Sequence, residues 1–195
     1  MRRSFITIGT ALLFSLAACT SEPKTAQAPS ASSSIQQSKG SMSKIDLTPD
    51  AQGLSKAVVT IKTKKGVIQY KFYSKDAPKT VDRMVELIQQ GFYNGLTFHR
   101  IVPGFVVQGG DPNGNGTGGS GTKLKAEFNS RKHVEGTVAM ARSSDPNSAD
   151  AQFYICLGTH PHLDNSYTVF GQVIAGQDVV RKLSMGDTMD SVSVE

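Results

Sequence analysis

The sequence predicts a mainly β fold, a closed or nearly closed β-barrel accompanied by two helices. Seven short runs rich in β-branched, aromatic and aliphatic residues alternate with clusters of Gly, Asn and Asp. Two further segments repeat apolar residues at helical spacing. An open sheet built from many short strands leaves unpaired edges, so closure into a barrel is the expected arrangement.

The folded part is predicted to begin with a hairpin that leads into a helix. Residues 58–63 and 67–72 are β-type runs joined by a Lys-Lys-Gly turn. Residues 78–90 then place apolar side chains at i, i+3, i+4 and i+7. Pro78 suits the first turn of this helix, and Gly91 suits its C-terminal end.

The remainder is predicted as short strands, tight turns and one more helix. Turns are expected at 111–113 and 145–147, where Asp, Pro and Asn follow one another. A helix is expected over 177–183, because its aliphatic residues fall on one face. The strands are expected at 97–102, 105–108, 136–141, 152–157 and 168–173.

Length and composition indicate one globular domain or two small ones. A chain of 195 residues with 38% hydrophobic residues can bury a sizeable core, which excludes full disorder. Two cysteines are too few for a disulfide scaffold. Cys156 lies in an apolar, aromatic run, where a free thiol is expected to serve as a small buried hydrophobe.

The N-terminal part is predicted to be an export signal and a tether. In residues 1–18 two arginines precede an apolar run shorter than the ~20 residues of a membrane-spanning helix. The run ends Leu-Ala-Ala before Cys19, which resembles a bacterial lipobox, so lipidation of Cys19 is expected; an ordinary signal peptide containing a cysteine is the alternative. Residues 19–55 are rich in Ser, Ala and Gln and indicate a flexible tether, which leaves 56–195 as the folded domain.

These segments predict an exported protein, anchored by its lipid on the periplasmic or cell-surface side of a bacterial membrane. The net charge of +5 falls to +3 when residues 1–18, which hold two arginines and no acid, are removed. So small a surplus does not indicate a nucleic-acid partner, and none is expected.

Two motifs suggest cofactor or metal sites but lack the required context. Residues 114–119 fit G-x-G-x-x-G, yet no apolar helix follows them, so an irregular glycine loop is expected instead of a dinucleotide site. His160 and His162 could share a face, but no third ligand stands at a metal-site spacing. We therefore expect neither a metal nor a cofactor.

One segment is unusual on physical grounds. Residues 98–111, FHRIVPGFVVQGGD, carry an arginine within a strand-like apolar run and end on Gly-Gly-Asp. This segment closely resembles the central motif of cyclophilins, the peptidyl-prolyl cis–trans isomerases. Segments 136–142, 152–155, 163–164 and 169–171 match the same family in order and spacing. The resemblance extends over residues 56–195 and implies the family fold, a closed eight-stranded antiparallel β-barrel with two flanking helices.

The resemblance also implies site residues. Arg100 matches the catalytic arginine of the family. Positions that line the proline pocket or hold the flanking peptide are matched by His99, Phe105, Val106, Gln108, Ala141, Arg142, Gln152, Tyr154, Leu163 and Tyr167. The implied substrates are proline-containing polypeptides, and a monomer is expected.

These residue types suit rotation about a prolyl bond. The peptide bond resists rotation by ~18–20 kcal/mol, because the nitrogen lone pair conjugates with the carbonyl. A guanidinium beside the prolyl nitrogen can hydrogen-bond to that lone pair as conjugation is lost, so the contact favours the twisted state over the ground state. No nucleophile, base or metal is needed.

Four positions depart from the family pattern. His162 stands where a tryptophan is common, so weak cyclosporin binding is expected. Tyr154 replaces the usual pocket phenylalanine and brings a hydroxyl that needs a partner. Tyr167 replaces a histidine, and Arg142 replaces an asparagine. Catalysis is expected to survive with altered substrate preference.

The sequence thus favours an isomerase that assists the folding of exported proteins. The alternative is a non-catalytic module, a chaperone or adhesin that binds proline-containing segments in the same groove. A lipocalin-like barrel would fit the composition but does not explain the motif around Arg100.

Overall fold

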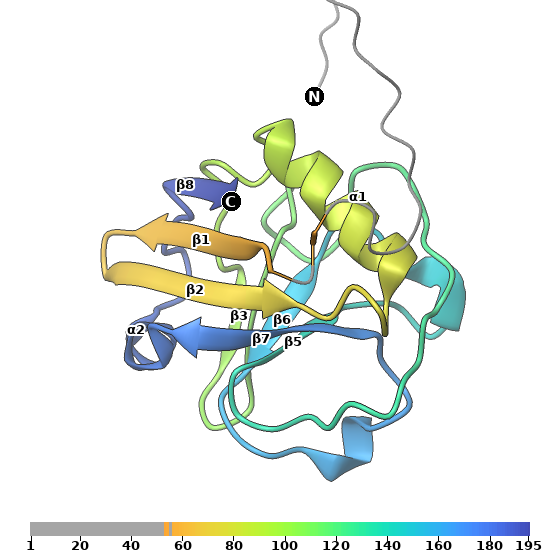
Figure 1. Ribbon diagram of the computed structural model, residues 1–195. Coiled ribbons are helices and arrows are strands. Elements are labelled where there is room, and N and C mark those ends of the chain that lie inside the picture. Colours follow the sequence, from red (N-terminus) through yellow and green to blue (C-terminus); the bar gives the residue numbers. More distant parts are fainter. Residues whose placement is uncertain (1–52, 55) are drawn as a thin grey trace, which may run out of the picture. The chain divides into compact units, whose positions relative to one another are not determined.

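The computed structural model describes residues 53, 54 and 56–195 and is drawn in Figure 1. The predicted signal peptide, Cys19 and nearly all of the predicted tether lie outside the described residues. The elements are β1 (Val58–Thr63), β2 (Gly66–Phe72), α1 (Pro78–Gln89), β3 (Arg100–Val102), β4 (Val106–Gly109), β5 (Thr137–Met140), η1 (Pro146–Ser148), β6 (Phe153–Cys156), η2 (Pro161–Leu163), β7 (Val169–Ala175), α2 (Gln177–Lys182) and β8 (Ser191–Val194).

All eight strands belong to one antiparallel sheet, with the order β3-β4-β6-β5-β7-β2-β1-β8. The prediction of a closed barrel is wrong, because β3 and β8 are the edges of an open, curled sheet. Only one isolated bridge, between Thr97 and Thr188, links the segments that precede these two edge strands. The edges therefore meet through irregular loops and not through a paired ladder.

The loops nevertheless protect the polar backbone near both edges. Gly95 donates its amide to the carbonyl of Met189 at 2.7 Å, and Phe98 donates to Asp187 at 2.9 Å. Backbone groups that face a neighbouring loop in this way offer no template for another chain. This irregular pairing also explains why the strand predicted over 97–102 is regular only in β3.

Alternation along the strands separates two apolar clusters. Val107 of β4 and Ile155 of β6 point into the main core inside the curled sheet. Their neighbours Val106 and Tyr154 point to the other face, into a smaller cluster that also contains Cys156. Because side chains alternate with a period of two, one run of sequence builds both the core and the outer surface. Cys156 is buried, as predicted.

The two helices follow the sequence prediction closely. Pro78 is the first residue of α1, and Gly91, with φ of +70°, follows its end. The carboxylate of Glu127 accepts hydrogen bonds from the free backbone amides of Lys79 and Thr80, which satisfies donors at the helix start. α1 lies beside β8, and α2 lies beside β2 (Figure 1).

One strand, β8, was not expected from the sequence pattern. The strand is short, its sequence Ser-Val-Ser-Val is half polar, and only Val192 of it is buried. Pairing with β1 and a hydrogen bond from the Val192 amide to the side chain of Asn94 hold it in place. Within the described part of the chain, no helix is long and apolar enough to cross a membrane.

Candidate active site

The register of four strands brings distant residues into one transverse row. Arg100 of β3 pairs with Gln108 of β4, Gln108 pairs with Tyr154 of β6, and Tyr154 pairs with Ala139 of β5. Directly paired residues project from the same face of a sheet. The row therefore places an arginine, an amide and an aromatic ring side by side on the outer face.

A cavity of about 290 Å³ opens beside this row. Nine residues line it, and all nine are site residues predicted from the sequence: Arg100, Phe105, Val106, Gln108, Ala141, Arg142, Tyr154, Leu163 and Tyr167. Strands and loops far apart in the chain thus converge on one small space.

The apolar walls of the cavity are held by aromatic contacts. The ring of Tyr154 meets that of Tyr167 edge-on, with centroids 5.8 Å apart. Phe105 stacks on His162 at 5.9 Å and meets His160 edge-on at 4.8 Å. His160 also donates from Nε2 to the Phe105 carbonyl at 3.0 Å. Two histidines therefore fix the ring at the cavity rim.

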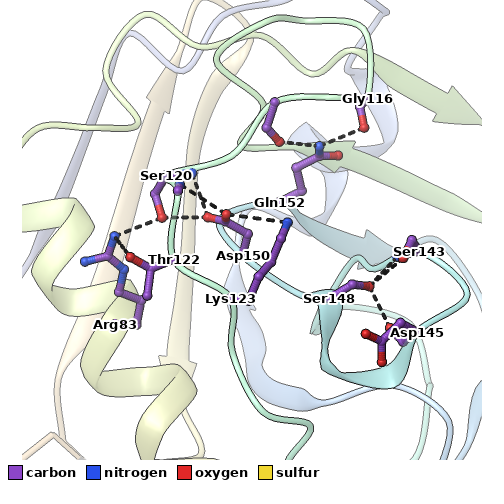
Figure 2. A network of polar contacts seen from close by, with 12 residues as sticks. Arg83, Gly116, Ser120, Thr122, Lys123, Ser143, Asp145, Ser148, Asp150 and Gln152 are labelled. Carbon is purple, nitrogen blue, oxygen red and sulfur yellow. Dashed lines mark hydrogen bonds and ion pairs between the residues drawn. The ribbon is translucent and has the colours of Figure 1, made fainter.

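A chain of amides connects Arg100 to a glycine-rich loop. Arg100 Nη1 donates to Gln108 Oε1 at 3.2 Å, and Gln108 Nε2 donates to Gln152 Oε1 at 3.0 Å. Gln152 Nε2 donates in turn to the carbonyls of Gly116 and Gly118, at 3.0 and 2.8 Å (Figure 2). This orientation of both amides is the one that satisfies every contact in the chain. The guanidinium is exposed, yet one side of it is positioned by the protein.

A second cavity of about 250 Å³ shares Gln108, Ala141 and Arg142 with the first and extends past Gln152. Figure 2 shows the polar network around it. The buried carboxylate of Asp150 accepts hydrogen bonds from the amide and hydroxyl of Ser120, both at 2.6 Å. These bonds hold the glycine-rich loop over the sheet, so the loop forms a fixed wall.

The same loop explains the G-x-G-x-x-G match. Gly114 and Gly116 have φ of +65° and +91°, which only glycine adopts freely. The carboxylate of Asp111 accepts hydrogen bonds from the amides of Asn113 and Asn115 at 2.8 and 2.9 Å. The amides of this loop are thus directed at the protein's own carboxylate, and hydrogen bonding from Asn113 and its neighbours lowers the pKa of Asp111 against the opposing effect of burial.

Arg142 joins two loops where the cavities meet. Its guanidinium donates to the Ser143 carbonyl at 2.8 Å and to the Ser166 carbonyl at 2.9 Å. Its Cζ lies 4.6 Å from the centre of the Tyr167 ring. An arginine fork with five donors suits such bridging of carbonyls. The residue that departs from the family pattern here therefore organises the wall of the groove.

The hydroxyl of Tyr154 has a buried partner. It lies 3.0 Å from Nε2 of His133, and Nδ1 of His133 lies 3.1 Å from the carboxylate of Asp164. Burial lowers the pKa of His133 although Asp164 opposes this effect. Several hydrogen-bond donors lower the pKa of Asp164 to about 2, and the backbone amide of His133 has the largest effect among them.

Two predicted site residues lie elsewhere. Gln152 lines the second cavity and reaches the first only through Gln108. His99 lines neither cavity; among the described residues, neither of its buried ring nitrogens has a hydrogen-bond partner, and burial lowers its pKa. Cys19 lies outside the described residues.

Sequence reasoning missed the residues behind the groove. His133 has no neighbouring histidine or cysteine in sequence, so no local motif marks it as a site residue. Its partners Tyr154 and Asp164 are 21 and 31 residues away, so no local spacing reveals the contact. The one available signal was the tyrosine itself, because a phenol in an apolar pocket requires a polar partner.

The arrangement suits recognition of a small apolar ring beside a polar chain. Phe105, Leu163 and Tyr154 provide apolar surface, and Arg100 provides a charged donor at its edge. Within the described part of the chain, no cluster of three or more His, Cys, Asp or Glu residues could hold a metal ion.

Comparisons with known proteins agree on one family. The model of the cyclophilin type peptidyl-prolyl cis-trans isomerase family matches residues 58–195. A peptidyl-prolyl cis-trans isomerase of Synechococcus elongatus is 47% identical over 136 residues, which covers 69% of this chain and 93% of the relative. Peptidyl-prolyl cis-trans isomerase B of Bacillus subtilis is 43% identical over 130 residues and covers 66% of this chain and 90% of the relative.

Solved structures give the same result. A cyclophilin type peptidyl-prolyl cis-trans isomerase of Cryptosporidium parvum superposes with a TM-score of 0.67 at 27% identity, covering 71% of this chain and 96% of that one. A crystal structure of the Cryptosporidium protein in the presence of the dipeptide Ala-Pro superposes with a TM-score of 0.62 at 28% identity, covering 70% and 96%.

Proposed function

The chain belongs to the cyclophilin-type peptidyl-prolyl cis–trans isomerases and has their activity, and on that premise we propose how its groove works and where it acts. The cavity beside Arg100 binds the proline ring, and the second cavity receives the chain on one side of it. The observation that carries this assignment is the joint lining of one cavity by Arg100 and the apolar residues Phe105, Tyr154 and Leu163.

Binding of the ring begins the reaction. Phe105 and Leu163 are half-buried in the free protein, so a proline ring between them covers apolar surface that water now contacts. Proline is rigid and loses little conformational freedom on binding. The ring is thereby held while the preceding carbonyl remains free to rotate.

Arg100 lowers the barrier to that rotation. As the peptide bond twists, the prolyl nitrogen becomes pyramidal and its lone pair becomes available as an acceptor. The guanidinium beside the cavity donates to this lone pair and, because it stays charged, provides a strong hydrogen bond in the twisted state. Since a planar amide nitrogen accepts poorly, the contact stabilises the transition state more than the bound ground state.

Hydrogen bonds from protein side chains to the peptide backbone hold the rest of the substrate in place. Gln108 lines both cavities, Gln152 lines the second, and the amide chain through them reaches the glycine-rich loop. A peptide that bridges the cavities can hydrogen-bond to these side chains while its proline is in the pocket. Only the prolyl bond then turns.

The dipeptide present with the Cryptosporidium relative suggests a direct test of this assignment. Cis–trans exchange of a short Ala-Pro peptide is measured by NMR with the full chain. The exchange, which takes tens to hundreds of seconds without catalyst, should become much faster. Changes in the chemical shifts of Phe105 and Leu163 on addition of the peptide would support the pocket. Unchanged chemical shifts at saturating peptide would contradict it.

The same proposal places the enzyme outside the cytoplasm on a bacterial membrane. Support comes from the basic start, the apolar run and the Leu-Ala-Ala-Cys motif of residues 1–19. A lipid on Cys19 and a tether of about 35 residues would let the isomerase act on exported chains near the membrane. Labelling of cells with radioactive palmitate should mark the wild type and not Cys19→Ser; equal labelling of both would refute the anchor.

A further inference from the structure

A chain of buried polar side chains runs behind the wall of the cavity. His133 is only 1% exposed, and its two ring nitrogens face Tyr154 and Asp164 at 3.0 and 3.1 Å. The backbone amide of His133 also donates to Asp164, at 2.9 Å. Lys132 lies 3.1 Å from the second oxygen of the same carboxylate. The imidazole is thus fixed from both sides.

These contacts determine where the protons lie. The donors around Asp164 lower its pKa to about 2, so at neutral pH the carboxylate is ionised and only accepts. Nδ1 of His133 must therefore carry the proton that is shared with Asp164. A neutral imidazole then has a lone pair at Nε2, and the Tyr154 hydroxyl donates its hydrogen to it.

His133 also contacts more than one wall of the cavity. Its ring stacks on Tyr154 at 6.1 Å and meets Tyr167 edge-on at 6.4 Å. Its partner Asp164 directly follows Leu163, a third lining residue. One buried side chain therefore connects three separate parts of the proposed proline pocket.

We propose that His133, held by Asp164, is a positioning residue for prolyl isomerisation that acts through the Tyr154 hydroxyl. This proposal rests on the assignment of the cavity as the proline pocket. The acceptor at Nε2 turns the phenol's hydrogen away from the bound proline and fixes the ring that forms the pocket wall. Without that acceptor, the buried hydroxyl would need water or another partner, and either choice shifts the ring or wets the pocket.

The test is a double-mutant cycle in the full chain with an Ala-Pro peptide. His133→Asn retains an amide near the Nδ1 position but is too short to reach Tyr154. Loss of one hydrogen bond predicts a fall in kcat/KM of about fivefold. His133→Gln, whose side-chain oxygen can accept at the Nε2 position, should recover most of the loss. In a Tyr154→Phe background, His133→Asn should change kcat/KM less than twofold, because the contact is already absent.

A control separates this effect from general loss of stability. Asn94→Ala removes the side-chain hydrogen bond to the Val192 amide at β8, away from both cavities, and should lower the melting temperature without changing kcat/KM. The positioning role is overturned if His133→Asn is as active as wild type, or if it loses the same factor in both backgrounds.

A second readout does not depend on folding of the variants. Nitrogen-15 NMR of the wild-type chain should show His133 as the tautomer protonated at Nδ1, and a proton on Nε2 at neutral pH would overturn the proposal. Arg100→Ala identifies a failure of the underlying assignment. If Arg100→Ala retains full activity, the pocket assignment fails; if it is inactive while His133→Asn is unaffected, only the positioning role fails.

Discussion

The amide of Gln108 donates to the amide of Gln152 at 3.0 Å and accepts from Arg100 at 3.2 Å, so two side chains connect the proposed catalytic arginine to the glycine-rich loop. Gln152 in turn is held by two loop carbonyls, of Gly116 and Gly118. The position of Arg100 thus depends on residues up to 52 positions away in sequence.

Gln152→Ala should therefore lower the rate of catalysis, although Gln152 does not contact the prolyl bond. Removal of the amide leaves Gln108 free to rotate and releases one side of Arg100. Since a hydrogen bond of this kind contributes about 1 kcal/mol, kcat should fall roughly fivefold in a peptide assay. A Gln152→Glu variant still accepts from Gln108 but can no longer donate to the carbonyls of Gly116 and Gly118, so it should lose activity as well. Full activity in either variant would argue against the amide chain.

Arg142→Ala is expected to weaken substrate binding more than turnover. The guanidinium holds the carbonyls of Ser143 and Ser166, and without it both loops lose an anchor. KM for an Ala-Pro peptide should rise several-fold while kcat stays within about twofold, and amide hydrogen exchange should increase in both loops. An unchanged exchange rate at Ser166 would contradict this role.

Acidification should destabilise the fold in two steps. The pKa of His133 is lowered in the folded protein, so the unfolded chain binds more protons and stability is lost as the pH falls below about 6.5. The pKa of Asp164 is also lowered, to about 2 from 3.8, so its contribution is lost between those values.

Unfolding in denaturant from pH 7.5 to 5 isolates the first step. His99, whose pKa is also lowered, contributes in the wild type and in His133→Asn alike. The variant should therefore show a shallower dependence of the free energy of unfolding on pH. Equal slopes for the two proteins would mean that His133 does not bind its proton more weakly in the folded state.

Cyclosporin should bind weakly. His162 stands at the position where the family commonly has tryptophan, and its small ring stacks on Phe105 at the rim of the pocket. His162→Trp restores a large aromatic surface with an indole donor and should tighten binding by about tenfold or more in calorimetry. A wild-type affinity equal to that of the variant would show that this position does not determine inhibitor binding.

Much of the fold could be predicted because local signals agree with the tertiary structure. The hairpin, its Gly66 and the helix that begins at Pro78 lie within a residue or two of the predicted bounds. β8 escaped prediction because its short, half-polar sequence becomes a strand only by pairing with β1, a long-range event. The prediction of a closed barrel was wrong because the edge strands, of three and four residues, meet through loops. The pattern of apolar residues does not specify how the edges pair.

In the candidate site, too, some features could be predicted from the sequence and others could not. The family resemblance selected nine residues that do line one cavity, because the motif preserves their register across β3, β4 and β6. It could not reveal the partner of the Tyr154 hydroxyl, since His133 becomes its neighbour only through folding. It also placed His99 in the groove, whereas that side chain lines neither cavity.

The central claim is that the guanidinium of Arg100 stabilises the twisted prolyl bond. The most direct measurement is kcat/KM of Arg100→Ala and Arg100→Lys on an Ala-Pro peptide, with peptide affinity measured in parallel. Loss of a preorganised donor predicts a fall of about 10²-fold for Arg100→Ala, with affinity changed far less, and only partial recovery in Arg100→Lys. Wild-type turnover in Arg100→Ala would contradict the account.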